Sequence, residues 1–340
     1  MGRVGQEHHA QNDRYRVRHA GPLLPPLVQD AVEDLLARVD RALPGRVPGF
    51  YLVGSACTAA FVPGRSDVDF VAIVDGEPSA HELRRLAAIH VGRWVASLAE
   101  DVTLRGRWPL VCNGIYVRQS DLARSALEVV PIAGHVAGRF RVAQRAGFDV
   151  NPVTWTTLAD HGIAIRGPHR DRLAIHTDCQ ELRRWSLSNL NGYWRRWTKR
   201  ALDVRALPRR AAAAGVLGAP RLHYTITSGQ IATKEAAGHY ACTVFDPGWH
   251  ALIEDALAFW LESPAPVVYR HRPLRRRHDA SRFVAAVIDA ANQLARAQRL
   301  RTATVPAGSR RVLLAASRVR SRSPSPLRRS RNVQVRDPRG

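Results

Sequence analysis

Residues 50–74 read FYLVGSACTAAFVPGRSDVDFVAIV and contain two short apolar runs joined by a turn. The first run, 50–53, ends in Gly54-Ser55, and the second, 66–74, is followed at once by Asp-Gly. Apolar runs of this length between turn residues are typical of strands. The stretch therefore predicts a strand, a turn that opens a short helix, and a second strand.

The second run carries two carboxylates, Asp67 and Asp69, separated by one apolar residue. Side chains alternate along a strand, so these two face the same side, while Val68 and Phe70 face a core on the other side. Two neighbouring carboxylates repel each other unless a cation lies between them. Mg²⁺ prefers oxygen ligands and binds through one or two carboxylates plus substrate phosphates. We therefore predict that Asp67 and Asp69 bind Mg²⁺.

The Gly54-Ser55 turn offers groups that bind phosphate. Backbone N–H groups at a helix start bind phosphate, and the hydroxyls of Ser55 and Ser66 add hydrogen-bond donors. A phosphate cradle beside paired carboxylates is the layout that metal-assisted phosphoryl or nucleotidyl transfer requires. The alternative is an ordinary turn next to an edge strand. The twelve-residue spacing from Ser55 to Asp67 and the apolar alternation favour the functional interpretation.

The segments around this stretch alternate between helix and strand. Apolar residues at helical spacing predict helices, and short apolar runs predict strands. The expected elements are helices at 26–43, 79–98 and 151–161, a strand at 110–117, and a strand or turn at 162–166. This alternation predicts an α+β or α/β domain with a short mixed sheet, ending near residues 167–168.

From about residue 176 the pattern becomes helical. The helical segments are 178–203, 221–245, 248–262 and 280–299, and the Ala/Gly/Pro-rich residues 207–220 are predicted to be a flexible connection. The chain is therefore expected to be α+β overall, with an α-helical bundle after the mixed domain. The predicted parts are a disordered N-terminus at 1–24, the mixed domain at 25–168, the helical domain at 169–302, and a disordered basic tail at 303–340.

Composition excludes several classes of protein. Hydrophobic residues make up 45% of the 340 residues and charged residues 24%, which is typical of globular proteins. No apolar run is long enough for a membrane span or a signal peptide, so we expect a cytoplasmic protein without membrane contact. The four cysteines lie more than 50 residues apart, which argues against a zinc ribbon or a disulfide scaffold.

The formal net charge is +22, from 51 Lys and Arg against 29 Asp and Glu. Basic residues are concentrated in 301–340 and in the segment RHRPLRRRH at 270–278. One interpretation is a nucleic-acid or phosphate-binding surface. The other is a solvated tail and an exposed linker, which the lack of aromatic residues for base stacking in the tail favours.

Three stretches carry a resemblance to a known family. GSACTAAFVPGRSDVDFVAIV at 54–74 resembles the signature of the DNA polymerase β-type nucleotidyltransferase superfamily, and more narrowly that of the streptomycin/spectinomycin adenylyltransferases. RLHYTITSGQIATKEAAGHYA at 221–241 is similar to the helical C-terminal domain of that family. LADHGIAIRGP at 158–168 resembles the segment that leads into it. The resemblance covers roughly residues 26–300.

The resemblance implies a two-domain nucleotidyltransferase with ATP and Mg²⁺ in the cleft between the domains. Such an enzyme transfers AMP to a hydroxyl and releases pyrophosphate. By position, the residues that match the family's nucleotide-binding set are Gly54, Ser55, Ser66 and Lys234, and those that match its metal-binding carboxylates are Asp67 and Asp69.

The sequence departs from the family at two places. The family has a third, catalytic carboxylate on the strand expected at 110–117, where this chain has Asn113. An amide could offer its carbonyl oxygen to a metal, but it cannot accept a proton as a general base. The nearby carboxylates Glu100, Asp101 and Asp121 could each substitute as the base, although none is in register. The run Ala211 to Ala214 stands where aminoglycoside-modifying members carry acidic residues, so aminoglycosides should bind poorly.

Three functions follow from these observations. The first is a Mg²⁺-dependent adenylyltransferase that acts on a hydroxyl of an unknown small molecule. The second is a non-catalytic nucleotide-binding homologue, disabled by Asn113. The third is a nucleic-acid-associated protein that binds through its basic tail. The match of the whole 54–74 stretch favours the first.

Overall fold

The structure is a computed structural model that describes residues 24–99, 110–144, 150–199, 208–264 and 266–303. The chain forms two compact units, Met1–Asn292 and Gln293–Gly340. The segments predicted to be disordered lie almost wholly outside the described residues, at 1–23 and 304–340. The predicted domain boundary near residue 168 stays a prediction.

Six strands form one mixed sheet in the order β5-β4-β3-β2-β1-β6. Only β2 and β3 pair in parallel, and the other neighbours are antiparallel. The strands are β1 Gly49–Val53, β2 Val68–Ile73, β3 Cys112–Val117, β4 Ala133–Val136, β5 Arg139–Val142 and β6 Ile163–Arg166. The sheet is therefore mixed, as the sequence predicts.

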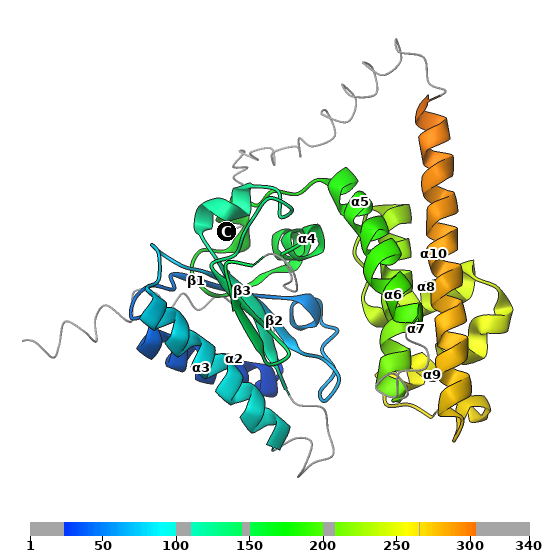
Figure 1. The fold of residues 1–340 in the computed structure, drawn as a ribbon, viewed down its shortest axis with the longest axis horizontal. Coiled ribbons are helices and arrows are strands. Elements are labelled where there is room, and N and C mark those ends of the chain that lie inside the picture. The colour runs from blue at the N-terminus through cyan, green and yellow to red at the C-terminus, as the bar shows by residue number, and fades with distance from the viewer. Residues whose placement is uncertain (1–23, 100–109, 145–149, 200–207, 265, 304–340) are drawn as a thin grey trace, which may run out of the picture. The chain divides into compact units, whose positions relative to one another are not determined.

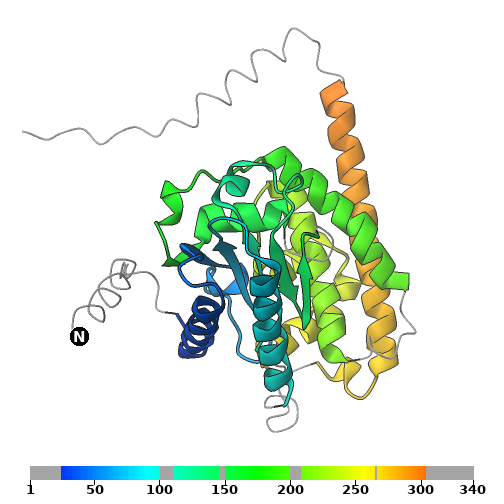
Figure 2. The ribbon, with the colours of Figure 1, turned by 60° about the vertical axis from the view of Figure 1, so that its left-hand side comes forward.

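Helices cover both faces of the sheet. On one face α2 (Pro26–Ala42) and α3 (Ala80–Ser97) lie on the same side of the strands in both views (Figures 1 and 2). Phe50 and Phe70 point into this core, where their rings stack with centroids 4.7 Å apart. On the other face α4 (Pro152–His161) packs through Trp155 against the alternate strand residues. Strands between two apolar layers explain the nearly continuous apolar runs of β1 and β2.

The rest of the described chain is helical. The helices are α5 Cys179–Asn189, α6 Arg195–Lys199, α7 Arg209–Ser228, α8 Lys234–Val244, α9 His250–Trp260 and α10 Pro273–Ala303, with a π-helical turn at Leu190–Trp194. Helix α7 packs against α5, α8 and α9. The segment 221–245, predicted to be helical, is interrupted after Ser228 by Gly229, whose φ is +78°. The α+β fold class with a helical C-terminal region is confirmed.

The prediction of a flexible connection at 207–220 is wrong, because most of it lies in α7. The small residues that suggested a flexible chain make room for tryptophans instead. A Cβ on Gly215 would lie 2.5 Å from the ring of Trp197, and one on Gly218 would lie 2.7 Å from the ring of Trp194. Trp194 and Trp197 therefore pack against the small residues of α7.

The hairpin of β4 and β5 was not predicted. Each strand has only four residues, and β5 reads RFRV, which hides any alternation of apolar residues. Its turn has Ala137 at φ +46° and Gly138 at φ +80°. Turns of this kind are usually recognised in a sequence by Asn-Gly, which is absent here.

The prediction of an exposed linker at 270–278 is partly wrong, because α10 begins at Pro273. Arg277 is 1% exposed, and its guanidinium lies 3.6 Å from the ring centroid of Trp197. Arg276 donates to the buried carboxylate of Asp255 at 2.9 Å. These two arginines stabilise the helices and are not part of a nucleic-acid surface. Among the described helices, none is long and apolar enough to cross a membrane.

A buried histidine makes the sheet core sensitive to acid. His90 of α3 lies 2.8 Å from the hydroxyl of Tyr116 through Nε2, and its ring stacks on His135 with centroids 4.9 Å apart. Burial, followed by the neighbouring His135, lowers the pKa of His90 to about 3. In the unfolded chain a histidine titrates near pH 6.5.

We therefore expect the free energy of unfolding to fall as the pH decreases from about 6.5 towards 3, because the unfolded chain binds more protons there. His90 contributes up to about 1.4 kcal/mol per pH unit to this slope. The variant His90→Phe keeps a ring in the stack and should flatten the slope, even if losing the partner of Tyr116 lowers stability at every pH. Urea unfolding at pH 8, 6 and 5 measures both slopes. Equal slopes in the two proteins would contradict this assignment.

Candidate active site

The predicted carboxylates lie where β2 begins. Asp67 immediately precedes β2 and Asp69 is its second residue, so the strand is shorter than the predicted 66–74. Both side chains are half-buried, whereas Val68 and Phe70 are buried in the core. The prediction that Asp67 and Asp69 face one side of the strand, and Val68 and Phe70 the core on the other side, is therefore confirmed.

Asn113 lies beside this pair. The parallel pairing of β2 with β3 sets Asn113 opposite Asp69. Its Nδ2 donates to Asp67 Oδ2 at 3.1 Å, and its Oδ1 accepts the backbone N–H of Ala137 at 3.0 Å. Three of the predicted site residues thus meet at one end of two neighbouring strands, with Asn113 only 6% exposed.

The turn after β1 completes this edge of the site. Residues Gly54–Ala56 form a short 3₁₀ turn, and Gly54 has φ +68°. A Cβ on Gly54 would overlap the carboxylate of Asp69. Glycine therefore serves two purposes here, since it adopts the left-handed backbone and leaves room for Asp69. Ser55 is half-buried at the same turn.

The side chain of Ser66, predicted as a hydrogen-bond donor to phosphate, is buried. It is 4% exposed, and its Oγ accepts the backbone N–H of Val62 at 3.0 Å. The hydroxyl thus holds the loop that leads into Asp67. A direct contact of Ser66 with a phosphate stays a prediction.

Lys234 brings a cation to the carboxylates from the helical part of the chain. It is the first residue of α8, and its Nζ lies 3.8 Å from the ring centroid of Trp260. Burial, and then the charge of Arg221, lowers the pKa of Lys234 to about 8, while Asp67 and Asp69 act in the opposite direction. The lysine predicted from the resemblance is therefore within electrostatic reach of both carboxylates.

Two arginines of α7 act on the same carboxylates. Burial lowers the pKa of Arg210, and the charge of Asp67 opposes this shift. Burial also lowers the pKa of Arg221, opposed by Asp69, and its Nε donates to the carbonyl of Ala232 at 2.9 Å. The two carboxylates are thus surrounded by more positive than negative charge.

Arg65 adds a further cation just before Asp67. Its guanidinium lies 3.8 Å from the ring centroid of Phe259 in α9, and it forms an ion pair with Glu262 at 3.4 Å. Arg65, Arg210 and the electrostatic role of Arg221 were missed in the sequence. Nearly every basic residue of this chain is arginine, so a single arginine carries no signal, whereas the rare Lys234 does.

The donor set fits a magnesium ion. Asp67 and Asp69 offer oxygen ligands from neighbouring positions, and Mg²⁺ commonly binds through two carboxylates and completes its shell with water and phosphate. Among the described residues, no group of three or more His, Cys, Asp or Glu could hold a metal. The site therefore fits an ion that arrives with an anionic ligand rather than an all-protein cage.

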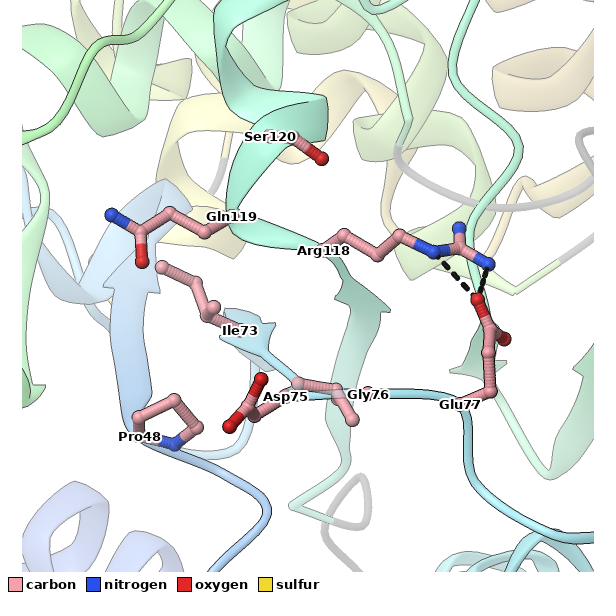
Figure 3. Close-up of a pocket in the computed structure, with 9 residues that line it drawn as sticks. Pro48, Ile73, Asp75, Gly76, Glu77, Arg118, Gln119 and Ser120 are labelled. Carbon is pink, nitrogen blue, oxygen red and sulfur yellow. Dashed lines mark hydrogen bonds and ion pairs between the residues drawn. The ribbon is translucent and has the colours of Figure 1, made fainter.

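A separate hollow of about 570 Å³ opens at the other end of β2. Figure 3 shows Arg118 and Glu77 paired across it, with Ile73 and Asp75 on its wall. Asp69 and Ile73 are four residues apart on one strand, which corresponds to about 13 Å. The hollow is therefore distinct from the carboxylate site.

The comparisons with known proteins identify a fold. No family model and no curated protein matches the chain. Solved structures do match the chain. One of them is spectinomycin adenyltransferase AAD(9) from Enterococcus faecialis, determined with ATP and spectinomycin. It superposes with a TM-score of 0.54 at 12% identity, over 76% of this chain and 99% of that chain. At this identity the likeness shows the fold alone.

Gly54→Ala should disable the site without unfolding the protein. The added methyl displaces the carboxylate of Asp69. We expect affinity for Mg²⁺ and ATP to fall by at least about tenfold, a loss of about 1.4 kcal/mol in binding. Isothermal titration calorimetry measures this change.

Gly45→Ala is the matched control, because Gly45 has φ +70° and nothing within 4 Å of a new Cβ. Both variants carry a backbone cost of about 1–3 kcal/mol, and only Gly54→Ala should change binding. Equal binding losses in both would show that backbone strain, and not Asp69, causes the effect.

Proposed function

We propose that the protein is a Mg²⁺-dependent nucleotidyltransferase that transfers AMP from ATP to a hydroxyl of a small molecule in the cytoplasm. The observation that carries this proposal is the meeting of Asp69 with the Gly54 turn and of Asp67 with Asn113 beside it, within electrostatic reach of the cations Lys234 and Arg210. The adenylyltransferase-like fold supports it. The small-molecule acceptor is proposed by analogy with that neighbour, whose structure contains spectinomycin.

The charges of the site suit a triphosphate. Burial of Lys234, Arg210 and Arg221 removes them from water, which strengthens their attraction for an anion. Lys234 packs on the ring of Trp260 and Arg221 donates to the carbonyl of Ala232, and neither of these two contacts supplies a negative charge. ATP would bring the missing negative charge, with Gly54 and Ser55 at its phosphates.

The proposed reaction has simple bond changes. The acceptor hydroxyl oxygen bonds to the α-phosphorus of ATP, the bond from that phosphorus to the bridging oxygen breaks, and pyrophosphate leaves. Mg²⁺, held by Asp67 and Asp69, would neutralise charge on the phosphates. Lys234, Arg210 and Arg221 would bind and orient the same phosphates, and in-line orientation is a large part of the rate enhancement in such transfers.

The hydroxyl proton must leave by a route other than Asn113, because an amide cannot accept it. Asp121, considered from the sequence as a substitute base, does not serve. It is 4% exposed, accepts the backbone N–H of Arg118 at 3.0 Å, and pairs with Arg118 and Arg124. Glu100 and Asp101, the other two substitutes, lie outside the described residues.

The orientation of Asn113 also supports a second candidate, a nucleotide-binding protein without transferase activity. ATP binding with no AMP transfer to any acceptor, and no ATP hydrolysis, would favour this candidate. Nucleic-acid association through the tail stays a prediction, since residues 304–340 lie outside the described part of the chain.

Nucleotide binding should depend on metal, on Asp69 and on Lys234. We expect Asp69→Asn, or chelation of Mg²⁺, to weaken ATP binding by at least about tenfold. Lys234→Met should weaken it by a similar factor, because a charge-assisted contact contributes about 1.5–3 kcal/mol. Calorimetry with ATP measures all three effects.

The chain offers matched controls. Asp30→Asn removes an exposed carboxylate on α2, and Lys199→Met removes the other lysine, which is exposed at the end of α6. Neither should change ATP affinity. Equal affinity of wild type and Asp69→Asn, with and without Mg²⁺, would overturn the site assignment.

Streptomycin should be a poor acceptor. Ala212 and Ala213 are buried inside α7, so the alanine run offers no acidic contact, and Arg65 and Arg210 repel a cationic drug. We expect neutral or anionic hydroxyl compounds to gain the mass of AMP, and streptomycin not to, in a mass-spectrometric screen with ATP and Mg²⁺. Robust streptomycin adenylylation would contradict this expectation.

A further inference from the structure

The orientation of the Asn113 amide is set from both ends. A backbone N–H can only donate, so the atom that faces Ala137 N at 3.0 Å must be Oδ1. The other end, Nδ2, therefore faces Asp67 Oδ2, at 3.1 Å. Reversing the amide would place N–H groups against each other and two oxygens against each other. The hydrogen-bond partners thus dictate that Asn113 presents donors to Asp67.

The turn that fixes this amide is itself held firmly. His135 is 1% exposed; its Nε2 accepts the N–H of Gly138 at 3.1 Å, and its Nδ1 donates to the carbonyl of Cys112 at 3.0 Å. On the other side, a Cβ on Gly138 would lie 2.6 Å from the ring of Trp94. Ala137 therefore has a defined position, and so does the amide that its N–H meets.

We propose that this site takes one divalent cation rather than two, and that Asn113 sets that number. The inference rests on the proposed function in so far as the cation is Mg²⁺. A second cation beside Asp67 Oδ2 would need further oxygen ligands there, and Asn113 offers N–H groups instead. Its one oxygen is directed at the N–H of Ala137, at the opposite end of the amide from the Nδ2 that meets Asp67. Two-metal transfer sites hold both ions with shared carboxylates, and among the described residues no group of three or more His, Cys, Asp or Glu could hold a metal.

Fixed cations supply charge where a second metal is lacking. Arg210 acts on Asp67 and Arg221 acts on Asp69, both from α7, and Lys234 acts on both carboxylates. These side chains are part of the protein, so their charges need no additional oxygen ligands, whereas a second metal ion would. The site thus combines one exchangeable cation with several permanent ones.

The test counts Mn²⁺ ions bound to the full chain, using electron paramagnetic resonance with Mn²⁺ in place of Mg²⁺. The titration is done with and without a non-hydrolysable ATP analogue. Wild type should bind one Mn²⁺ per chain in the presence of the analogue. Asn113→Asp should bind two, with the broadened signal of two coupled ions.

Asn113→Asp should also show a metal-dependent stability. One of its oxygens can accept the N–H of Ala137, which sets the other against Asp67, where two carboxylates repel. In chelator its Tm should fall below that of wild type by at least about 2–4 °C, which corresponds to about 1 kcal/mol. Mn²⁺ should restore it.

Asn151→Asp is the matched control. Asn151 is 8% exposed and its Oδ1 caps α4 by accepting the N–H groups of Val153 and Thr154. Aspartate fills such a cap equally well, so this variant should bind one Mn²⁺ and show no chelator effect.

Two Mn²⁺ ions on wild type, or one on Asn113→Asp, would overturn the proposal. If Asn113→Asp does not fold, the wild-type count alone decides. Wild type that binds one Mn²⁺ but no ATP analogue would overturn the proposed function and support the count. Wild type that binds the analogue together with two Mn²⁺ ions would support the proposed function and overturn the one-cation proposal.

Discussion

The parallel pairing of β2 with β3 is the constraint on which the site depends. It sets Asn113 beside Asp69, and it requires Gly114, since a Cβ there would lie 2.5 Å from the ring and the carbonyl of Phe70. Phe70 in turn stacks on Phe50 in the core. Because strand side chains alternate, anchoring Phe70 in the core commits Asp69 to the opposite face. The apolar packing of the sheet thus fixes the direction of the carboxylate.

Three buried cations from the helical part of the chain interact with the same carboxylates. Burying Lys234, Arg210 and Arg221 carries a desolvation cost, and the charges of Asp67 and Asp69 offset part of it. Aromatic rings of α9 contribute as well, through the contact of Trp260 with Lys234. The positive charge that these three side chains place near the carboxylates is the feature that supports the proposed phosphate ligand.

Sequence reasoning was most accurate where local pattern and tertiary packing agree. The strands β1 and β2 have apolar runs that end in turn residues, and α2 has an uninterrupted apolar face, so each was predicted within a few residues. It was wrong where a distant partner decides the structure. The Ala/Gly/Pro composition of 207–220 is typical of a flexible segment, and only the rings of Trp194 and Trp197 explain why it is a helix. The arginines of the site were missed for a different reason, because arginine is too common in this chain to be informative.

The orientation of the Asn113 amide is the feature of the site that the sequence alone does not determine. The sequence indicates that a carboxylate is absent from this strand, which bears on proton transfer. It does not indicate which way the amide points, because that depends on the β4–β5 turn, which has no recognisable sequence signal. Once the turn is in place, the N–H of Ala137 takes the amide oxygen, and Asp67 faces hydrogen-bond donors instead of a potential metal ligand. One residue therefore links two properties that are usually treated separately. A carboxylate at this position would accept the hydroxyl proton and would also help to hold a second cation. Because Asn113 stands there instead, both properties are lost together.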